Sequence, residues 1–237
     1  MTPRKEFQNE IRYLHEQIIC MGANVEKALT RSTDALFTGD ASLAEKVIND
    51  DDIIDEQERE IDRQCVRLIA LQQPVARDLR DVTSNLKLIT DLERIADHAV
   101  GIAKHSLDFH ARGSTAIIPS DVMKLAEKTR QILRGALDSY VTRDKSKAEQ
   151  TIQMEQSIYE IYRSLMQDLV IQMKNNPDSL IALVELILIC KNFERAAAHS
   201  QNVAEWVIYY IDGRHAYYME EEIKQKEGSN SQENTDA

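Results

Sequence analysis

The residues with the clearest chemical potential in this sequence are carboxylates on the apolar side of two expected helices. Because an α-helix turns by about 100° per residue, the direction of each side chain follows from its number. Over residues 40–72 an apolar stripe is formed by Val47, Ile54, Ile61, Cys65 and Leu68. The acids within about 80° of the centre of this stripe are Asp51, Asp55, Glu58 and Asp62. The pattern places negative charge where apolar side chains are normally expected.

The next expected helix, over residues 74–111, has the same feature. Its apolar stripe consists of Leu79, Val82, Leu86, Ile89 and Val100. Glu93 lies at the centre of the stripe, and Asp97 lies about 40° from it. Acids from two neighbouring helices are therefore expected to point into one bundle.

Carboxylates that face a protein interior need protonation, a basic partner or a bound cation, because an unpaired buried anion is strongly disfavoured. Basic residues on the same face are few, and Lys104 is one candidate. Clustered carboxylate oxygens suit Mg, Mn, Ca or Fe. The sequence thus predicts a cation site in this part of the chain. The alternative is that these acids lie at the edge of the stripe and reach solvent.

An internal repeat organises the whole chain. The string Glu93–His98 resembles Glu194–His199, and Asp40 and Pro74 have counterparts in Asp144 and Pro177, at offsets of 101 to 104 residues. Such self-similarity is typical of a duplicated supersecondary unit. We predict an all-α fold of two tandem, pseudo-symmetric three-helix bundles. They cover residues 1–112 and 119–220, and a polar, disordered tail covers residues 227–237.

The second repeat serves as an internal comparison for the acids. The counterparts of Asp55, Glu58, Asp62 and Asp97 are Tyr159, Tyr162, Met166 and Ala198. Only two acids are retained, Glu155 in place of Asp51 and Glu194 in place of Glu93. These replacements are less polar, as expected at inward-facing positions. We therefore predict metal ligands at Asp51, Asp55, Glu58, Asp62, Glu93 and Asp97, with Glu155 and Glu194 as weaker candidates.

The prolines and glycines support helices as the main elements. The chain has only 7 Gly, 4 Pro and 5% aromatic residues, which favours long helices over a β-sandwich or barrel. Thr38-Gly39-Asp40 is typical of a helix end followed by an N-cap. The expected helices cover residues 3–38, 40–72, 74–111, 119–142, 144–174 and 177–213.

Charge and composition restrict the partners. The net charge is −11, which disfavours nucleic acid and anionic membrane surfaces. No apolar run is long enough to span a bilayer, so a membrane association would require a partner protein. Cys20, Cys65 and Cys190 include no CxxC pair and predict reduced thiols that pack as small apolar groups, as in a cytoplasmic protein.

The sequence offers no catalytic machinery. The GxxxxGK[ST], GxGxxG, GxSxG and HExxH motifs are all absent from it. A ferritin-like di-iron site would need ExxH pairs, and none occurs. His98 and His199 lie about 140° from the directions of Glu93 and Glu194, so they are expected at a surface or an interface, with metal binding as the lesser alternative.

Several strings resemble the PhoU family. They are Gln73–Arg80, which ends in Asp-Leu-Arg, Asp91–Ala99, Phe193–Arg195, Asn202–Glu205 and Tyr210–Gly213. They occur in the same order as in that family and cover residues 5–215. The second copy departs from the family pattern, because it lacks the Asp-Leu-Arg string and has Ala198 where the family has Asp. Ala96 replaces a glycine of the family motif in the first copy.

The resemblance implies metal ions bound by E(D)xxxD motifs, which here are Asp51 with Asp55, Glu58 with Asp62, and Glu93 with Asp97. The expected cofactor is a divalent or trivalent ion such as Fe, Mn, Mg or Zn. The resemblance also implies a cytoplasmic, homodimeric, non-catalytic negative regulator of phosphate homeostasis. Its implied partners are the ATPase subunit of a phosphate-specific ABC transporter and a phosphate-sensing histidine kinase. An accessory role for a different phosphate permease and a metal-dependent enzyme remain the alternatives.

Overall fold

The computed structural model describes residues 3–111 and 117–213, and this part of the chain contains helices and no β-strand. The first three helices are α1 (Pro3–Thr38), α2 (Ala41–Gln72) and α3 (Ala76–Ala111). They are followed by α4 (Ser120–Thr142), α5 (Lys145–Gln153), α6 (Glu155–Asn175), a 3₁₀ turn η1 (Pro177–Ser179) and α7 (Leu180–Asp212). The predicted all-α class is confirmed. The tail predicted at residues 227–237 lies outside the described residues.

The helix expected over residues 144–174 is interrupted at Met154, which separates α5 from α6. The amide of Met154 donates to Thr151 O at 3.2 Å, a bond to the third preceding residue. The Thr151 hydroxyl donates back to Lys147 O at 2.8 Å. The backbone bond pattern thus tightens at this point to a bond over three residues, and one periodic segment forms two helices.

The two repeats begin their second helices in the same way. Asp40 accepts a hydrogen bond from the Leu43 amide at 3.0 Å, which confirms the predicted N-cap. Asp144 accepts from the amides of Ser146 and Lys147 in the equivalent position. Before these caps the chain adopts positive φ, at Gly39 (71°) and at Arg143 (52°).

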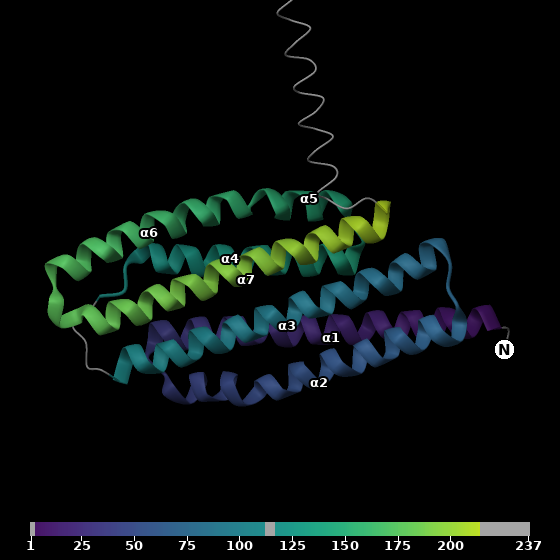
Figure 1. The fold of residues 1–237 in the computed structure, drawn as a ribbon, viewed down its shortest axis with the longest axis horizontal. Helices are drawn as coiled ribbons and strands as arrows, with labels where there is room; N and C mark the ends of the chain where they lie inside the picture. The colour runs from purple at the N-terminus through teal and green to yellow at the C-terminus, as the bar shows by residue number, and fades with distance from the viewer. Residues whose placement is uncertain (1–2, 112–116, 214–237) are drawn as a thin grey trace, which may run out of the picture.

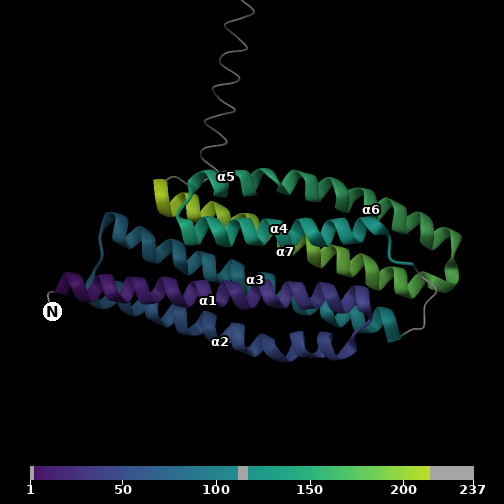
Figure 2. The same ribbon diagram turned by 180° about the vertical axis from the view of Figure 1, so that it is seen from behind.

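Figures 1 and 2 show α1–α3 as one bundle and α4–α7 as a second, with α3 and α7 side by side between them. The α3–α7 contact is the most extensive in the molecule. Leu92 and Ile95 of α3 and Phe193 of α7 are fully buried and belong to one hydrophobic core that continues through both repeats. Burial of such side chains contributes about 2 kcal/mol each, so the core holds the two repeats together.

The predicted apolar stripe of residues 40–72 is the buried face of α2. In α3 the stripe prediction is wrong at Leu79, which is 37% exposed in the first turn of the helix. Cys65 and Cys190 are buried, which raises the pKa of each thiol to about 12, whereas Cys20 is exposed. Within the described ranges, no helix has both the length and the apolarity needed to cross a membrane.

Candidate metal centre

The acids predicted as ligands in the first repeat line the contact between α2 and α3. Asp51, Asp55 and Glu58 of α2 are partly buried, and so are Glu93 and Asp97 of α3. Asp62, one turn further along α2, is exposed. The structure therefore brings five of the six predicted ligands to one interface and leaves the sixth at its edge.

Asp51 has the least favourable environment for a charged carboxylate in this group. Its Oδ1 is buried and has no hydrogen-bond partner, and it is the one such side-chain atom in the described part of the chain. Burial raises the pKa of Asp51 from 3.8 to about 6, and repulsion from Asp55 and Asp97 adds to this effect. Lys104, the basic residue singled out in the sequence, acts in the opposite direction. An orphaned, desolvated carboxylate oxygen is the kind of group that a cation would stabilise.

The other acids repel one another in the same way. Burial raises the pKa of Glu93, and repulsion from Asp97, Asp55 and Glu58 raises it further. Burial also raises the pKa of Glu58, followed by repulsion from Asp62. Charges on the two helices therefore act across their interface, as the stripe positions predict.

Arg94 also offsets part of this charge. Arg94 Nη1 lies 3.1 Å from Asp97 Oδ2, and Arg94 Nε lies 3.4 Å from Glu93 Oε2. Arg94 could not be predicted from helix geometry alone, because its Cα–Cβ bond points about 100° away from that of Glu93. The spacing of three residues between Arg94 and Asp97 was an available signal. The Arg94 side chain is 54% exposed, so these pairs are accessible to solvent.

The carboxylates of α2 and α3 lie near one another, but their oxygens do not form a tight ligand cluster. No three of these acids place ligand atoms within 4.8 Å of one another. Among the described residues, one group of three His, Cys, Asp or Glu side chains does so, and it lies elsewhere in the molecule. The side chains present fit a hard cation by their chemistry, since carboxylate oxygens are its preferred ligands. Rotation of partly exposed carboxylates, or water ligands, would be needed to complete a coordination shell.

The two acids retained in the second repeat have a different charge environment from their counterparts. Burial and repulsion from Glu194 raise the pKa of Glu155. Glu194 itself is paired with Lys191, whose Nζ lies 2.6 Å from Glu194 Oε2 and 5.3 Å from the centre of the Tyr162 ring. The first-repeat counterpart of Lys191 is Thr90. A lysine ammonium thus lies where the first repeat has no positive side chain.

His98 and His199 lie at the interface between the repeats. Their rings stack with centroids 5.6 Å apart, His98 Nδ1 lies 3.0 Å from Asn192 Oδ1, and His199 Nδ1 lies 2.8 Å from Asp91 Oδ1. Since residues 91 and 98 correspond to 192 and 199, each histidine contacts the partner repeat in the same crossed manner. The two rings therefore mark the pseudo-twofold axis, and no metal role is needed to explain them.

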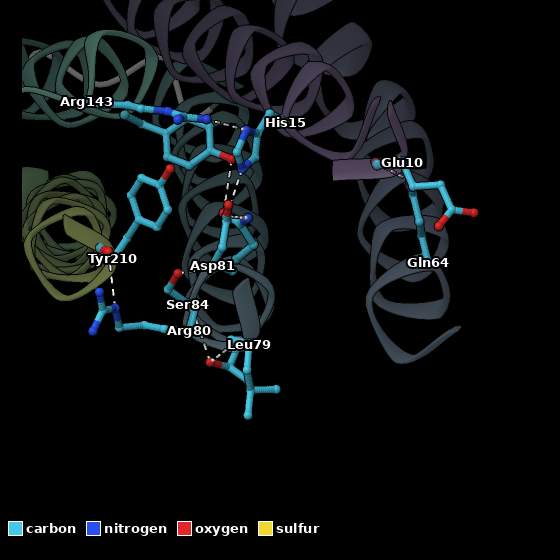
Figure 3. A network of polar contacts seen from close by, with 12 residues as sticks. Glu10, His15, Gln64, Leu79, Arg80, Asp81, Ser84, Arg143 and Tyr210 are labelled. Atoms are coloured by element: carbon cyan, nitrogen blue, oxygen red, sulfur yellow. Dashed lines mark hydrogen bonds and ion pairs between the residues drawn. The ribbon is translucent and has the colours of Figure 1, made fainter. Parts of the chain in front are cut away.

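A second set of contacts between the repeats was not foreseen (Figure 3). His15 Nε2 lies 2.8 Å from Asp81 Oδ1, and Arg143 Nη2 donates to His15 Nδ1 at 3.0 Å. Because arginine only donates, His15 Nδ1 accepts and its Nε2–H donates to Asp81. Asn85 Nδ2 also donates to Asp81, and the Tyr140 hydroxyl donates to Asn85 Oδ1, both at 3.0 Å.

Arg80, the last residue of the Asp-Leu-Arg string, belongs to the same region. Its Nε donates to Tyr210 O at 3.3 Å, and the Arg143 guanidinium lies 5.4 Å from the centre of the Tyr210 ring (Figure 3). This arginine thus joins α3 to the end of α7. The last residue of the string therefore contributes a hydrogen bond between the two repeats.

This duplicated helical bundle, with carboxylates at the α2–α3 contact of its first repeat, belongs to a class of protein that comparisons with known proteins identify. The PhoU domain family matches residues 18–106 and again residues 122–207. The chain belongs to the PhoU family. A phosphate-specific transport system accessory protein PhoU homolog from Clostridium acetobutylicum is 34% identical over 212 residues, which are 89% of this chain and 96% of the relative.

Two further proteins are similar over nearly the whole chain. A phosphate-specific transport system accessory protein PhoU homolog from Pseudomonas aeruginosa is 30% identical over 94% of this chain and 95% of its own. The crystal structure of PhoU from Pseudomonas aeruginosa superposes with a TM-score of 0.86 at 31% identity, covering 88% of this chain and all of that one. The relatives share the complete two-repeat architecture.

Proposed function

We propose that this protein is a non-catalytic accessory regulator of phosphate transport that binds a cation between α2 and α3. The regulatory part of the proposal is supported by the two family matches and by relatives that are named accessory proteins of phosphate-specific transport. It is also supported by similarity along almost the full length of both this chain and those relatives.

The single observation that carries the cation is the buried Oδ1 of Asp51, which lacks a hydrogen-bond partner among the described residues. Asp51, Asp55 and Asp97 would supply the central oxygens. Glu58, Asp62 and Glu93 would contribute at the margins. A bound Fe, Mn, Mg or Zn ion would supply positive charge and no reaction. It would remove the repulsion between the acids of α2 and α3 and hold these helices together.

The second repeat supports this interpretation by contrast. Its Lys191 is paired with Glu194 at 2.6 Å, while the repeat has lost most of the other acids. A fixed ammonium group there meets the same electrostatic need that we assign to a metal ion in the first repeat. Glu155 and Glu194 are accordingly the weaker ligands, and the proposal does not require an ion in that repeat.

The proposed partners are the ATPase subunit of a phosphate-specific ABC transporter and a phosphate-sensing histidine kinase, with a negative effect on uptake and signalling. The proposed working form is a cytoplasmic homodimer. An accessory role for another phosphate permease is the competing function. Both functions are compatible with an acidic helical protein, so identification of the bound partner is needed to distinguish them.

Affinity purification of the tagged full-length chain from its own cells, followed by mass spectrometry, tests the partner. Recovery of the ABC-type ATPase, together with higher phosphate uptake when the protein is deleted, supports the proposal. Recovery of a different permease without the ATPase would replace it by the competing function.

Elemental analysis of protein never exposed to chelator tests the cation. The Asp51→Asn variant is expected to lose the ion held between α2 and α3, whereas Asp52→Asn, which changes the exposed neighbouring acid, retains it. The absence of bound metal in the wild-type protein would contradict the cation part alone.

A further inference from the structure

A separate group of potential metal ligands lies where α3 meets α7. It consists of His105 and Asp108 of α3 and Glu185 of α7. One ligand atom of each residue lies within 4.8 Å of the others, and no other such group of three occurs in the described part of the chain. His105 Nδ1 lies 2.8 Å from Glu185 Oε2. The three side chains therefore converge from two different repeats.

Local helix geometry explains this convergence. His105 and Asp108 are three residues apart, so they lie on neighbouring turns of one face of α3. The contacts of α3 with α7 run in opposite chain directions, from Asp91 with His199, through His98 with Asn192, to His105 with Glu185. The antiparallel register thus brings Glu185, near the start of α7, to the last turns of α3.

The group has the donor types of a transition-metal site. Imidazole nitrogen and carboxylate oxygen are both ligand types that Zn²⁺ accepts in proteins, and a water molecule could take the fourth position. The His105 and Glu185 side chains are 29% and 12% exposed, so they are partly shielded from water. Asp108 is exposed and leaves the site accessible from solvent.

The distances are compatible with an ion after a small adjustment. Bonds of about 2.0–2.2 Å to a tetrahedral ion place its ligand atoms about 3.3 Å apart. The His105–Glu185 distance of 2.8 Å must therefore open slightly. Asp108, which is exposed, must move inward by a change of rotamer.

The positions of the second repeat that correspond to His105 and Asp108 carry different side chains. At the offset of 101 residues the counterparts of His105 and Asp108 are Trp206 and Tyr209. Their rings pack edge to face with centroids 6.0 Å apart. The two ends of the α3–α7 contact have therefore diverged. One carries an aromatic pair, and the other carries metal-binding side chains.

We infer that His105, Asp108 and Glu185 bind a divalent transition-metal ion of the Zn²⁺ type, which joins α3 to α7 and so links the two repeats. The site is distinct from the acids of α2 and α3, since Asp108 lies 11 residues, or about 16 Å along the helix, beyond Asp97. The inference goes beyond the proposed function and does not depend on it.

Zinc titration of the metal-free full-length protein tests this inference, with calorimetry for affinity and ¹⁵N NMR for the His105 ring. Zinc is expected to shift the Nδ1 resonance of His105. The Asp108→Asn variant, altered at an exposed position, is expected to bind this ion at least tenfold more weakly. His105→Gln is expected to bind one zinc ion fewer than the wild type.

Matched controls separate this site from the acids of the first repeat. His98→Gln removes another α3 histidine at the same interface and is expected to leave the His105 response to zinc intact. Asp51→Asn is expected to do the same. A His105 ring that does not respond to saturating zinc would overturn the inference. Unchanged zinc affinity and stoichiometry in both His105→Gln and Asp108→Asn would also overturn it. Neither result would affect the partner experiment above.

Discussion

Replacing Asp51 by asparagine should have opposite effects on stability in the absence and in the presence of metal. In the metal-free protein, burial and neighbouring acids raise the pKa of Asp51 from 3.8 to about 6. The folded state therefore holds this proton to higher pH than the unfolded state does. The free energy of unfolding then decreases as pH rises from about 4 to about 6, and it is level above that range.

The size of the effect follows from the same values. A change in pKa from 3.8 to about 6 corresponds to at most about 3 kcal/mol above pH 6. Asp51 is only partly buried, and solvent screening reduces this figure to about 1–2 kcal/mol. Asparagine carries no charge, so Asp51→Asn should stabilise the chelator-treated protein by that amount at pH 7 and should reduce its pH dependence.

Urea unfolding between pH 4 and 8, with chelator and with saturating Mn²⁺, measures both effects. Manganese should stabilise the wild type through binding to the native state. It should do little for Asp51→Asn, so that the order of stability reverses. Asp52→Asn, at the exposed neighbouring position, removes only the weakest of the repulsions that raise the pKa of Asp51 and should stay close to the wild type in both conditions. The reasoning would be refuted if Asp51→Asn were the less stable protein in chelator, or if Asp52→Asn gave the same gain.

Two further predictions concern the second repeat and the contact between the repeats. Lys191→Met removes the nearer of two basic partners of Glu194, whose side chain is 15% exposed and whose Oε2 also lies 3.7 Å from Arg195 Nε, and should lower the free energy of unfolding by about 1 kcal/mol. Addition of Glu194→Gln should restore most of the loss in a double-mutant cycle, and an additive result would contradict the pairing. Gly101→Ala places a Cβ 2.6 Å from Asn192 Oδ1, which contacts His98, and should destabilise the protein by about 1 kcal/mol. In an Asn192→Ala background, Gly101→Ala should instead stabilise the protein by up to about 1 kcal/mol, because alanine favours a helix more than glycine does. Chemical denaturation measures both changes. A loss of stability in both backgrounds would show that Asn192 is not the obstacle.

The sequence predicted the helices well because their signals are local. Apolar periodicity, the N-cap at Asp40 and the prolines each act within a few residues along the chain. The interruption at Met154 escaped this reasoning, because the sequence around it contains no glycine, proline or other helix-stop signal. The exposure of Leu79 escaped it too, because periodicity does not say how far a neighbouring helix extends.

The acids of the first repeat were also found from local geometry. Their angular positions on two helices indicated a shared interface, and Asp51, Asp55 and Glu93 do lie partly buried there. Their basic neighbours were harder to predict. Arg94 and Lys191 reach their carboxylates through long, flexible side chains, whose final positions depend on rotamers that a helical projection does not contain.

By itself, the sequence determined the all-helical class, the duplication and the faces of α2 and α3 on which acids lie, because these depend on spacing within one helix or one repeat. Only the tertiary structure decided that His98 meets His199 on the pseudo-twofold axis and that His105 meets Glu185. The residues of each pair are at least 80 positions apart in the sequence. Their contact depends on how α3 and α7 slide and rotate against each other as the common core packs.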